Sequence, residues 1–338
     1  MIRLDLVTGF LGAGKTTFLK RLIPQLAAAG EKIALLISDY GAVNIDRLFL
    51  EEELEGLCDV EMVVAGDFDS HRRRYKTKLI ALAMQGYDRV MVEPSGVYDV
   101  EEFFDVLHEE PLDQWYVAGT VMAVVDAGLP EELTEESEYL LMAQAAEAGA
   151  VVLSKTQTAD AAQRTRVADH LNRALARFGC GRHFALPEGD DLPADPRDTL
   201  WVKPWEALTK EDLTAIASAG WRAEDHEHRG YFRTNAYHTV YRLEAGLSVE
   251  EVCEAARQLF ADEAIGHVLR VKGFVPVPED AAHPWRQINI TRKEEEIRPA
   301  KAGQDILIVI GEGLDHPAVE ERLTRRNACS TAHWDRQA

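Results

Sequence analysis

The sequence predicts an α/β protein whose mainly parallel sheet is covered by helices on both faces, followed by a smaller C-terminal α+β domain. In the first half of the chain, short apolar and β-branched runs alternate with longer stretches of helical spacing, which is typical of a parallel sheet buried on both faces. A glycine-rich loop joins the first of these runs to the first helical stretch. Beyond residue 230, strand-like runs follow one another with few helices, which favours an antiparallel sheet.

The elements of the first half can be assigned in order along the chain. Strands are expected at residues 3–8, 32–38, 60–65, 89–93, 117–126 and 150–154. Helices are expected at residues 16–29, 72–85, 100–108, 134–148 and 158–178. Because ligands of such sheets bind beyond the carboxyl ends of the strands, the polar residues that follow the strands are the first candidates for a site.

The second half contains a loop, a connecting region and a second pattern. Prolines, glycines and acidic residues gather at 186–197 and end the first pattern. The later elements are expected as a strand at 231–243, a helix at 248–261, strands at 266–277, 285–291, 294–299 and 305–311, and a closing helix at 316–324. We therefore expect a first domain at residues 1–200, a linker at 201–229, a second domain at 230–326 and a polar tail at 327–338.

Charge and cysteine content narrow the possible partners and the compartment. The chain has 58 acidic and 37 basic side chains, a formal charge of −21, so we expect neither nucleic acid nor an anionic membrane as partner. Its four cysteines lie far apart, which argues against a disulfide framework or a thiolate zinc site. The chain goes directly into a strand, and no apolar stretch approaches the roughly 20 residues that span a bilayer. A cytoplasmic protein is expected.

Residues 9–16 read Gly-Phe-Leu-Gly-Ala-Gly-Lys-Thr, an uninterrupted GxxxxGK[ST] motif between a strand and a helix. The glycines let successive backbone N–H groups point at one anion, and the helix N-terminus adds unpaired N–H groups and the positive end of its dipole. Lys15 can reach the β- and γ-phosphates, and the Thr16 hydroxyl can ligate Mg²⁺. The loop predicts a nucleoside triphosphate site in a P-loop NTPase fold. Its expected nucleotide-binding residues are Gly9, Gly12, Ala13, Gly14, Lys15, Thr16 and Thr17.

With this loop, the chain resembles the CobW-like P-loop GTPases, relatives of the urease and hydrogenase accessory GTPases and of the nitrile hydratase activators. Further segments are similar to motifs of that family: Ser-Asp-Tyr-Gly at 38–41 with Asn-Ile-Asp at 44–46, Met-Val-Glu-Pro-Ser-Gly at 91–96, Val-Leu-Arg-Val-Lys-Gly-Phe at 268–274, and residues 306–311 with 314–315. The resemblance implies a GTP-hydrolysing domain that changes shape with nucleotide state. It also implies delivery of metal ions or metallocofactors to a client protein. Apart from the resemblance, a homo-oligomer is a candidate assembly.

Catalytic roles follow from what phosphoryl transfer needs, which is positioning and charge neutralisation. Lys15 is expected to stabilise charge on the β/γ-oxygens. Thr16 is expected to bind Mg²⁺, with Glu93 as the outer or direct carboxylate on the metal side. Asp39 is expected to orient water or the second side of Mg²⁺, with Asp46 a weaker candidate in the same segment. Gly96 is expected to give a backbone N–H to the γ-phosphate. Loss of that phosphate is expected to release residues 39–46 and 96–99.

The expected base-binding segment is Ser154-Lys155-Thr156-Gln157, where the GTPases that the chain resembles carry [Asn/Ser/Thr]-Lys-x-Asp. A carboxylate at the last position accepts from both N1–H and the amine of guanine, whereas the Gln157 amide offers one acceptor and a donor. The donor suits the acceptor at ring position 1 of adenine. Guanine preference is therefore expected to weaken by roughly tenfold to a hundredfold. GTP is the first expectation, with relaxed specificity or ATP as the alternative.

The sequence gives weaker evidence for a second metal ion, one that the protein would carry as cargo. The family usually carries Cys-x-Cys-Cys after the third strand, but this chain reads Gly-Asp-Phe-Asp-Ser-His at 66–71 and lacks those thiols. Asp67, Asp69 and His71 could still hold a harder ion; the alternative is an acidic turn in which Asp69 or Ser70 caps the next helix. His226 and His228 present the same choice between a transition-metal site and a solvated linker.

Three functions remain open from the sequence. The first is Mg-dependent NTP hydrolysis coupled to metal or metallocofactor delivery to a client metalloprotein or cofactor-dependent enzyme. The second is a nucleotide-dependent protein switch that handles no metal. The third, a small-molecule kinase, is the weakest, because the sequence offers no lid-like arginine-rich segment or separate acceptor pocket.

Overall fold

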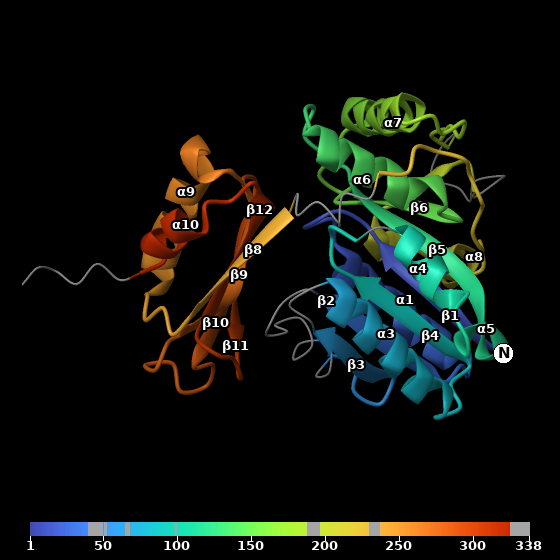
Figure 1. Cartoon of the computed structure of the whole chain (residues 1–338), viewed down its shortest axis with the longest axis horizontal. Helices are drawn as coiled ribbons and strands as arrows, with labels where there is room; N and C mark the ends of the chain where they lie inside the picture. The colour runs from blue at the N-terminus through green and yellow to red at the C-terminus, as the bar shows by residue number, and fades with distance from the viewer. Residues whose placement is uncertain are drawn as a thin grey trace, which may run out of the picture. The chain divides into compact units, whose positions relative to one another are not determined.

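The computed structural model of the chain describes residues 1–39, 50, 53–64, 68–98, 100–187, 197–229 and 237–324. The chain divides into two compact units, Met1–Ala236 and Tyr237–Ala338. The first is built on a seven-stranded parallel sheet and the second on a five-stranded antiparallel sheet (Figure 1). These two sheets confirm the predicted fold class.

In the first unit the strands run in the spatial order β3-β2-β4-β1-β5-β6-β7. Their bounds are β1 Ile2–Thr8, β2 Ile33–Asp39, β3 Asp59–Val64, β4 Arg89–Pro94, β5 Tyr116–Asp126, β6 Ala150–Ser154 and β7 Leu200–Trp201. Every neighbouring pair is parallel. The carboxyl ends of all seven strands therefore meet at one edge, which carries the phosphate loop.

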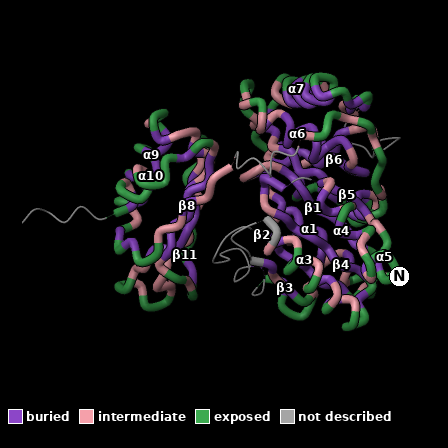
Figure 2. Tube along the Cα trace, in the orientation of Figure 1, coloured by how far each residue is buried: buried purple, intermediate pink, exposed green. Residues whose placement is uncertain are grey.

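Helices cover both faces of this sheet, as Figure 2 indicates by the buried strands between partly exposed helices. The helices are α1 Lys15–Ala28, α3 Phe68–Ala83, α4 Val100–Leu107, α5 Leu112–Trp115, α6 Glu135–Ala146, α7 Ala161–Arg177 and α8 Lys210–Ala217, with a 3₁₀ turn η1 at Trp205–Ala207. Side chains of α1 and α8 share one apolar cluster, and those of α3, α4, α6 and α7 share the other. Successive strand residues alternate between the clusters: Leu6 belongs to one and Val7 to the other.

A buried ion network holds the central strands together. Arg89 on β4 is 1% exposed; its guanidinium pairs with Asp5 of β1 and, at 2.5 Å, with Glu31. The second oxygen of Asp5 accepts the backbone N–H of Thr120 on β5 at 2.7 Å. A Cβ on Gly119 would lie 1.9 Å from the same oxygen, so only glycine fits there. The paired charges join β1, β4 and β5, and each has a hydrogen-bonded partner that offsets its desolvation.

The predicted linker 201–229 lies within the first unit. Leu200–Trp201 adds a seventh strand to the sheet, and α8 packs beside α1 through Leu213 and Ile216. A capping box in which Thr209 and Asp212 bond each other's backbone N–H groups begins α8. Apolar spacing is short and interrupted here, which is why the sequence alone suggested a connector. The predicted tail 327–338 lies outside the described residues.

The second unit is an antiparallel sheet with helices packed on its apolar side chains. The strand order is β11-β10-β9-β12-β8. Its elements are β8 Tyr237–Leu243, α9 Val249–Ala261, η3 Glu263–Ile265, β9 His267–Pro276, β10 Trp285–Ile290, β11 Glu295–Ala300, β12 Ile306–Glu312 and α10 His316–Arg322. A capping box of Ser248 and Glu251 begins α9. Val252 and Leu259 of α9 and Val319 of α10 share one core with the strands.

Candidate nucleotide site and metal-ligating residues

The loop between β1 and α1 has the backbone that its glycines predict. Gly9, Gly12 and Gly14 have φ values of +145°, +76° and +100°, which L side chains rarely adopt. A Cβ on Gly9 would also lie 2.3 Å from the Val124 carbonyl oxygen of β5. The backbone N–H of Ala13 bonds the Phe10 carbonyl at 3.1 Å, which closes the bend before α1. The loop therefore bends its backbone beside the N-terminus of α1. This arrangement suits the binding of an anion.

Lys15, the first residue of α1, folds back over this loop. Its Nζ donates to the carbonyl oxygens of Gly9 at 2.8 Å and Phe10 at 3.4 Å, and the residue is 8% exposed. The carbonyls hold the ammonium group at the loop, ready for an anionic ligand. Thr17, two residues further along α1, is exposed.

Thr16 and Glu93 form the contact expected of a metal-side pair. The Thr16 hydroxyl donates to Glu93 Oε1 at 2.6 Å, and Glu93 on β4 is 6% exposed. Two oxygen ligands at adjacent corners of a Mg²⁺ octahedron lie about 2.9 Å apart, given bonds of 2.0–2.1 Å. An oxygen-only pair at this spacing fits Mg²⁺.

Gly96 packs against the phosphate loop. A Cβ at this position would lie 2.6 Å from the backbone nitrogen of Leu11 and 2.8 Å from its Cα. The buried amide of Gln144 on α6 donates to the carbonyl of Gly96 at 3.2 Å and of Tyr98 at 3.4 Å. Gln144 was not predicted from the sequence, although a lone glutamine in the apolar stretch of α6 was a signal. The Gln144 side chain therefore connects the segment after β4 to α6.

The segment after β6 lies close to the phosphate loop. A Cβ on Gly14 would lie 3.7 Å from the Ser154 Cβ and 3.1 Å from the Trp205 ring. Lys155 has φ +57°, and its Nζ pairs with Asp126 Oδ2 at 2.9 Å. Gln157 is exposed two residues further on. The loop and the expected base-binding segment therefore lie side by side.

Asp126 and Trp205, which the sequence did not mark, contact residues of the candidate site. Asp126 ends β5 as Glu93 nearly ends β4, so a carboxylate closing an apolar strand was the available signal. Trp205 lies in the region taken for a linker; its Nε1 donates to the Leu153 carbonyl at 2.9 Å and its ring contacts Phe18. Both lie beside residues that the sequence assigned to the nucleotide.

His71, an expected cargo-metal ligand, is turned into the protein interior. Its Nε2 lies 2.8 Å from Ser38 Oγ, its Nδ1 lies 3.6 Å from Glu102 Oε1, and the residue is fully buried. Both ring nitrogens face partners on β2 and α4, so ligation of a cargo ion would require breaking these contacts. Asp67 lies outside the described residues, as do the side chains of Asp69 and Asp39. Asp46 also falls outside them.

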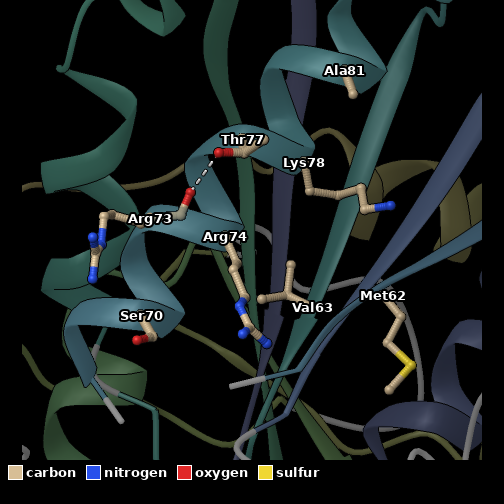
Figure 3. Close-up of a pocket in the computed structure, with 8 residues that line it drawn as sticks. All are labelled: Met62, Val63, Ser70, Arg73, Arg74, Thr77, Lys78 and Ala81. Carbon is tan, nitrogen blue, oxygen red and sulfur yellow. Dashed lines mark hydrogen bonds between the residues drawn. The ribbon is translucent and has the colours of Figure 1, made fainter. Parts of the chain in front are cut away.

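The three arginines that follow His71 have different surroundings. Arg72 pairs with Glu109, which follows α4, at 2.7 Å. Arg73 and Arg74 line a groove of about 820 Å³ beside the edge strand β3 (Figure 3). Lys78, on the same helix, pairs with Glu61 of β3 at 2.8 Å. Basic side chains thus gather on α3 in an otherwise acidic chain. The groove is lined by Met62, Val63, Ser70, Arg73, Arg74, Thr77, Lys78 and Ala81.

Metal-ligating side chains converge elsewhere in the first unit. One ligand atom from each of Glu101, His226 and His228 lies within 4.8 Å of the others. Glu101 is in the first turn of α4, and its Oε1 contacts His228 Nδ1. The two histidines were predicted as candidate ligands from the sequence, but Glu101, which lies 127 residues before His228, was not.

Among the described residues, no helix is long and apolar enough to cross a bilayer. The three cysteines that the structure describes, Cys58, Cys180 and Cys253, are free thiols. Burial raises the pKa of Cys58 to about 12 and that of Cys253 to about 11. Neither thiol is poised as a thiolate ligand or nucleophile.

Known proteins similar to this chain include two zinc chaperones and a GTPase of known structure. The zinc chaperone YeiR of Escherichia coli K12 is 24% identical over 356 aligned residues, covering 98% of this chain and all of that protein. The zinc chaperone CobW of Pseudomonas aeruginosa PAO1 is 25% identical over 371 aligned residues, covering 94% of this chain and 89% of that protein. The crystal structure of Zn(II)-bound YjiA GTPase from E. coli matches 95% of this chain and 97% of that one, at 18% identity and a TM-score of 0.35.

A family model gives the assignment. The model of the CobW/HypB/UreG nucleotide-binding domain matches residues 4–178. The match includes the phosphate loop, Glu93, Gly96 and the segment after β6, so the resemblance inferred from the motifs is confirmed. This chain belongs to the CobW/HypB/UreG nucleotide-binding family.

Proposed function

We propose that the protein binds a nucleoside triphosphate, GTP in the first place, and hydrolyses it with Mg²⁺, and that the cycle delivers a metal ion or metallocofactor to a client protein. The 2.6 Å contact between Thr16 and Glu93 beside the glycine loop carries the first part, because it unites the two expected Mg²⁺ ligands from segments far apart in the chain. Family membership and the full-length relatives named zinc chaperones support the second part.

The chemistry assigned to the chain is mainly electrostatic. In the bound state Lys15 Nζ exchanges the carbonyls of Gly9 and Phe10 for the β/γ-oxygens, so that its charge stabilises the negative charge that develops on them as the nucleoside diphosphate departs. Thr16 and Glu93 would hold Mg²⁺, which supplies charge neutralisation across the same oxygens. Gly96, which lies against Leu11, is proposed to give its backbone N–H to the γ-phosphate, and Asp39 at the end of β2 is the proposed water-orienting group.

Base selection is proposed to rest on the segment after β6. Lys155, held by Asp126, offers its stem as one wall for the base, and Gln157 offers an amide in place of a carboxylate. GTP fits the family, while the single acceptor of Gln157 allows ATP to compete. The measurement that separates them is a parallel titration of GTP and ATP.

A switch that handles no metal is the second candidate. His71 is engaged with Ser38 and Glu102, and the segment before it lacks thiols, so the family's usual cargo position offers no soft donor here. In that function, nucleotide state alone would control docking of a client. We place either activity in the cytoplasm, and a homo-oligomer is the candidate assembly of the chain.

The decisive test compares Lys15→Ala with Lys20→Ala in nucleotide binding and phosphate release. Lys20 lies on the same helix but pairs with Glu53 at 2.8 Å. We expect Lys15→Ala to lower turnover by about a hundredfold or more, and Lys20→Ala to behave as wild type. Unaltered binding and turnover in Lys15→Ala would refute the nucleotide assignment.

A further inference from the structure

We propose that Glu101, His226 and His228 form a surface site for a divalent transition-metal ion such as Zn²⁺. The inference rests on the proposed function only in treating this ion as the cargo. One ligand atom from each of the three residues lies within 4.8 Å of the others. Ligands of a tetrahedral Zn²⁺ with bonds of 2.0–2.1 Å lie about 3.4 Å apart. Small side-chain rotations therefore close the site.

The donor set selects the class of ion. Two imidazoles and one carboxylate suit Zn²⁺, Ni²⁺ or Cu²⁺ and are poor ligands for Mg²⁺, which prefers oxygen. Nδ1 of His226 lies 3.1 Å from the Glu227 carbonyl, and donation to that oxygen leaves Nε2 as the ligand nitrogen. Such a second hydrogen bond orients metal-bound histidines and raises their basicity.

The histidine segment is held on the first unit. The backbone N–H of Arg222 bonds the Glu147 carbonyl at 3.1 Å, and that of Glu227 bonds the Phe178 carbonyl at 2.8 Å. The backbone N–H of Arg229 bonds the Tyr139 hydroxyl at 3.0 Å, and its guanidinium lies 5.0 Å from the Phe178 ring. These anchors on both sides of His226 and His228 restrict the segment before any ion binds, which lowers the entropic cost of binding.

The proposed site is exposed to solvent, and a site that releases its ion to a partner needs such exposure. The side chains of His228 and Glu101 are 63% and 38% exposed. Three protein ligands leave a fourth position for water or for a donor from a partner. Ligand exchange with a client can therefore begin without unfolding.

The position of Glu101 connects the ion to the nucleotide site. Glu101 lies in the first turn of α4, five residues after Gly96. Gly96 contacts the phosphate loop at Leu11 and is bonded through its carbonyl to Gln144. An ion that joins Glu101 to the histidines thus fixes the start of the helix that follows the γ-phosphate segment.

The test is Zn²⁺ binding to the purified, nucleotide-free full chain, measured by competition with a chromophoric chelator. The variants are His226→Ala/His228→Ala and Glu101→Gln. The matched control, His183→Ala/Glu132→Gln, removes an exposed histidine and an exposed acid outside the group. Co²⁺ in place of Zn²⁺ reports nitrogen ligation through its visible absorption.

We expect the double histidine variant to lose at least about tenfold in Zn²⁺ affinity and the Co²⁺ band, Glu101→Gln to bind several-fold more weakly, and the control to match wild type. Equal Zn²⁺ affinity in wild type and in the double histidine variant would overturn the site. Since nucleotide is absent from this assay, loss of the NTPase assignment leaves the result standing, and loss of the metal site leaves the NTPase assignment standing.

Discussion

The Thr16 hydroxyl donates a 2.6 Å hydrogen bond to Oε1 of Glu93, across 77 residues of sequence. Thr16 sits at the start of α1 and Glu93 near the end of β4, and the two segments meet because β1 and β4 are parallel neighbours. Glu93 is 6% exposed, so its carboxylate needs partners close by. The same geometry gives the pair its proposed role as oxygen ligands of Mg²⁺.

Thr16→Val keeps the shape of the side chain and removes the oxygen. We expect the Mg²⁺ concentration for half-maximal nucleotide turnover to rise by about tenfold or more, because one ligand is lost and Glu93 loses a donor. Steady-state phosphate release across a Mg²⁺ titration measures it. Thr165→Val, on the exposed face of α7, is the control and is expected to leave the titration unchanged. An unshifted Mg²⁺ dependence in Thr16→Val would exclude the ligand role.

Gly96→Ala places a Cβ 2.6 Å from the Leu11 backbone nitrogen, so the phosphate loop or the segment after β4 must move. We expect triphosphate affinity or turnover to fall by at least about tenfold, since a shift of about 1 Å near reacting groups is costly. Gly181→Ala is the control, because a Cβ there meets nothing within 4 Å. Wild-type kinetics in Gly96→Ala would show that this contact does not position the nucleotide.

Gln157→Asp restores a carboxylate that can accept two hydrogen bonds from guanine. The ratio of GTP to ATP affinity is expected to increase by roughly tenfold to a hundredfold. Gln114→Asp makes the same charge change at an exposed site on α5 and should leave the ratio unaltered. Competition binding with both nucleotides gives the ratio, and an unchanged value in Gln157→Asp would remove this segment from base recognition.

His71→Ala is expected to lower the free energy of unfolding by about 1–3 kcal/mol, because Ser38 and Glu102 are left buried with a partner removed. Urea denaturation of His71→Ala and of the exposed control His183→Ala measures the difference. Zn²⁺ affinity is expected to stay at the wild-type value in His71→Ala. A tenfold loss of Zn²⁺ affinity there would return His71 to the list of metal ligands.

Glu109 joins α3 to the end of α4 through Arg72 at 2.7 Å and Lys76 at 2.6 Å. These cations lower the pKa of Glu109 from its usual 4.5. The ionised carboxylate therefore stabilises the fold at pH values above 4.5, and this contribution is lost as the pH falls through the lowered pKa.

We expect Glu109→Gln to be less stable than wild type by about 1 kcal/mol or less at pH 7, since Glu109 is one-third exposed. The gap should narrow as the pH falls from 5 towards 3.5. Urea unfolding at several pH values measures both chains. A gap that stays constant over this range would show that the ion pairs do not contribute.

Much of the architecture was readable from local patterns. The strands β1 to β6 and the longer helices between them follow apolar runs and helical spacing that each segment carries by itself, and so do the strands of the second unit. The four-residue helix α5 and residues 200–217 were not predicted, because a short helix or a two-residue strand carries too little periodicity to be recognised. Trp201 and Trp205 are buried by contacts with distant segments instead.

The candidate site was readable in part. The phosphate loop is contiguous, so its residue types and spacing reveal its chemistry. Asp126, Gln144 and Trp205 belong to segments with no such motif. A carboxylate ending β5 and a lone glutamine in α6 were weak signals, and the contacts that these residues make are seen only in the folded chain. His71 stands in an acidic segment that suggested ligation, and the structure shows its ring facing Ser38 and Glu102, which local sequence could not reveal.

The sequence by itself determined the order of strands and helices, the glycine bend after the first strand and the family, because each depends on residues that are close together in the chain. Tertiary structure alone decided which side chains meet. Glu93 reaches Thr16 through pairing of parallel strands, and Glu101 reaches His226 and His228 through the anchoring of a distant segment on the first unit. No local pattern encodes such contacts, because they depend on how buried surfaces pack across the whole unit.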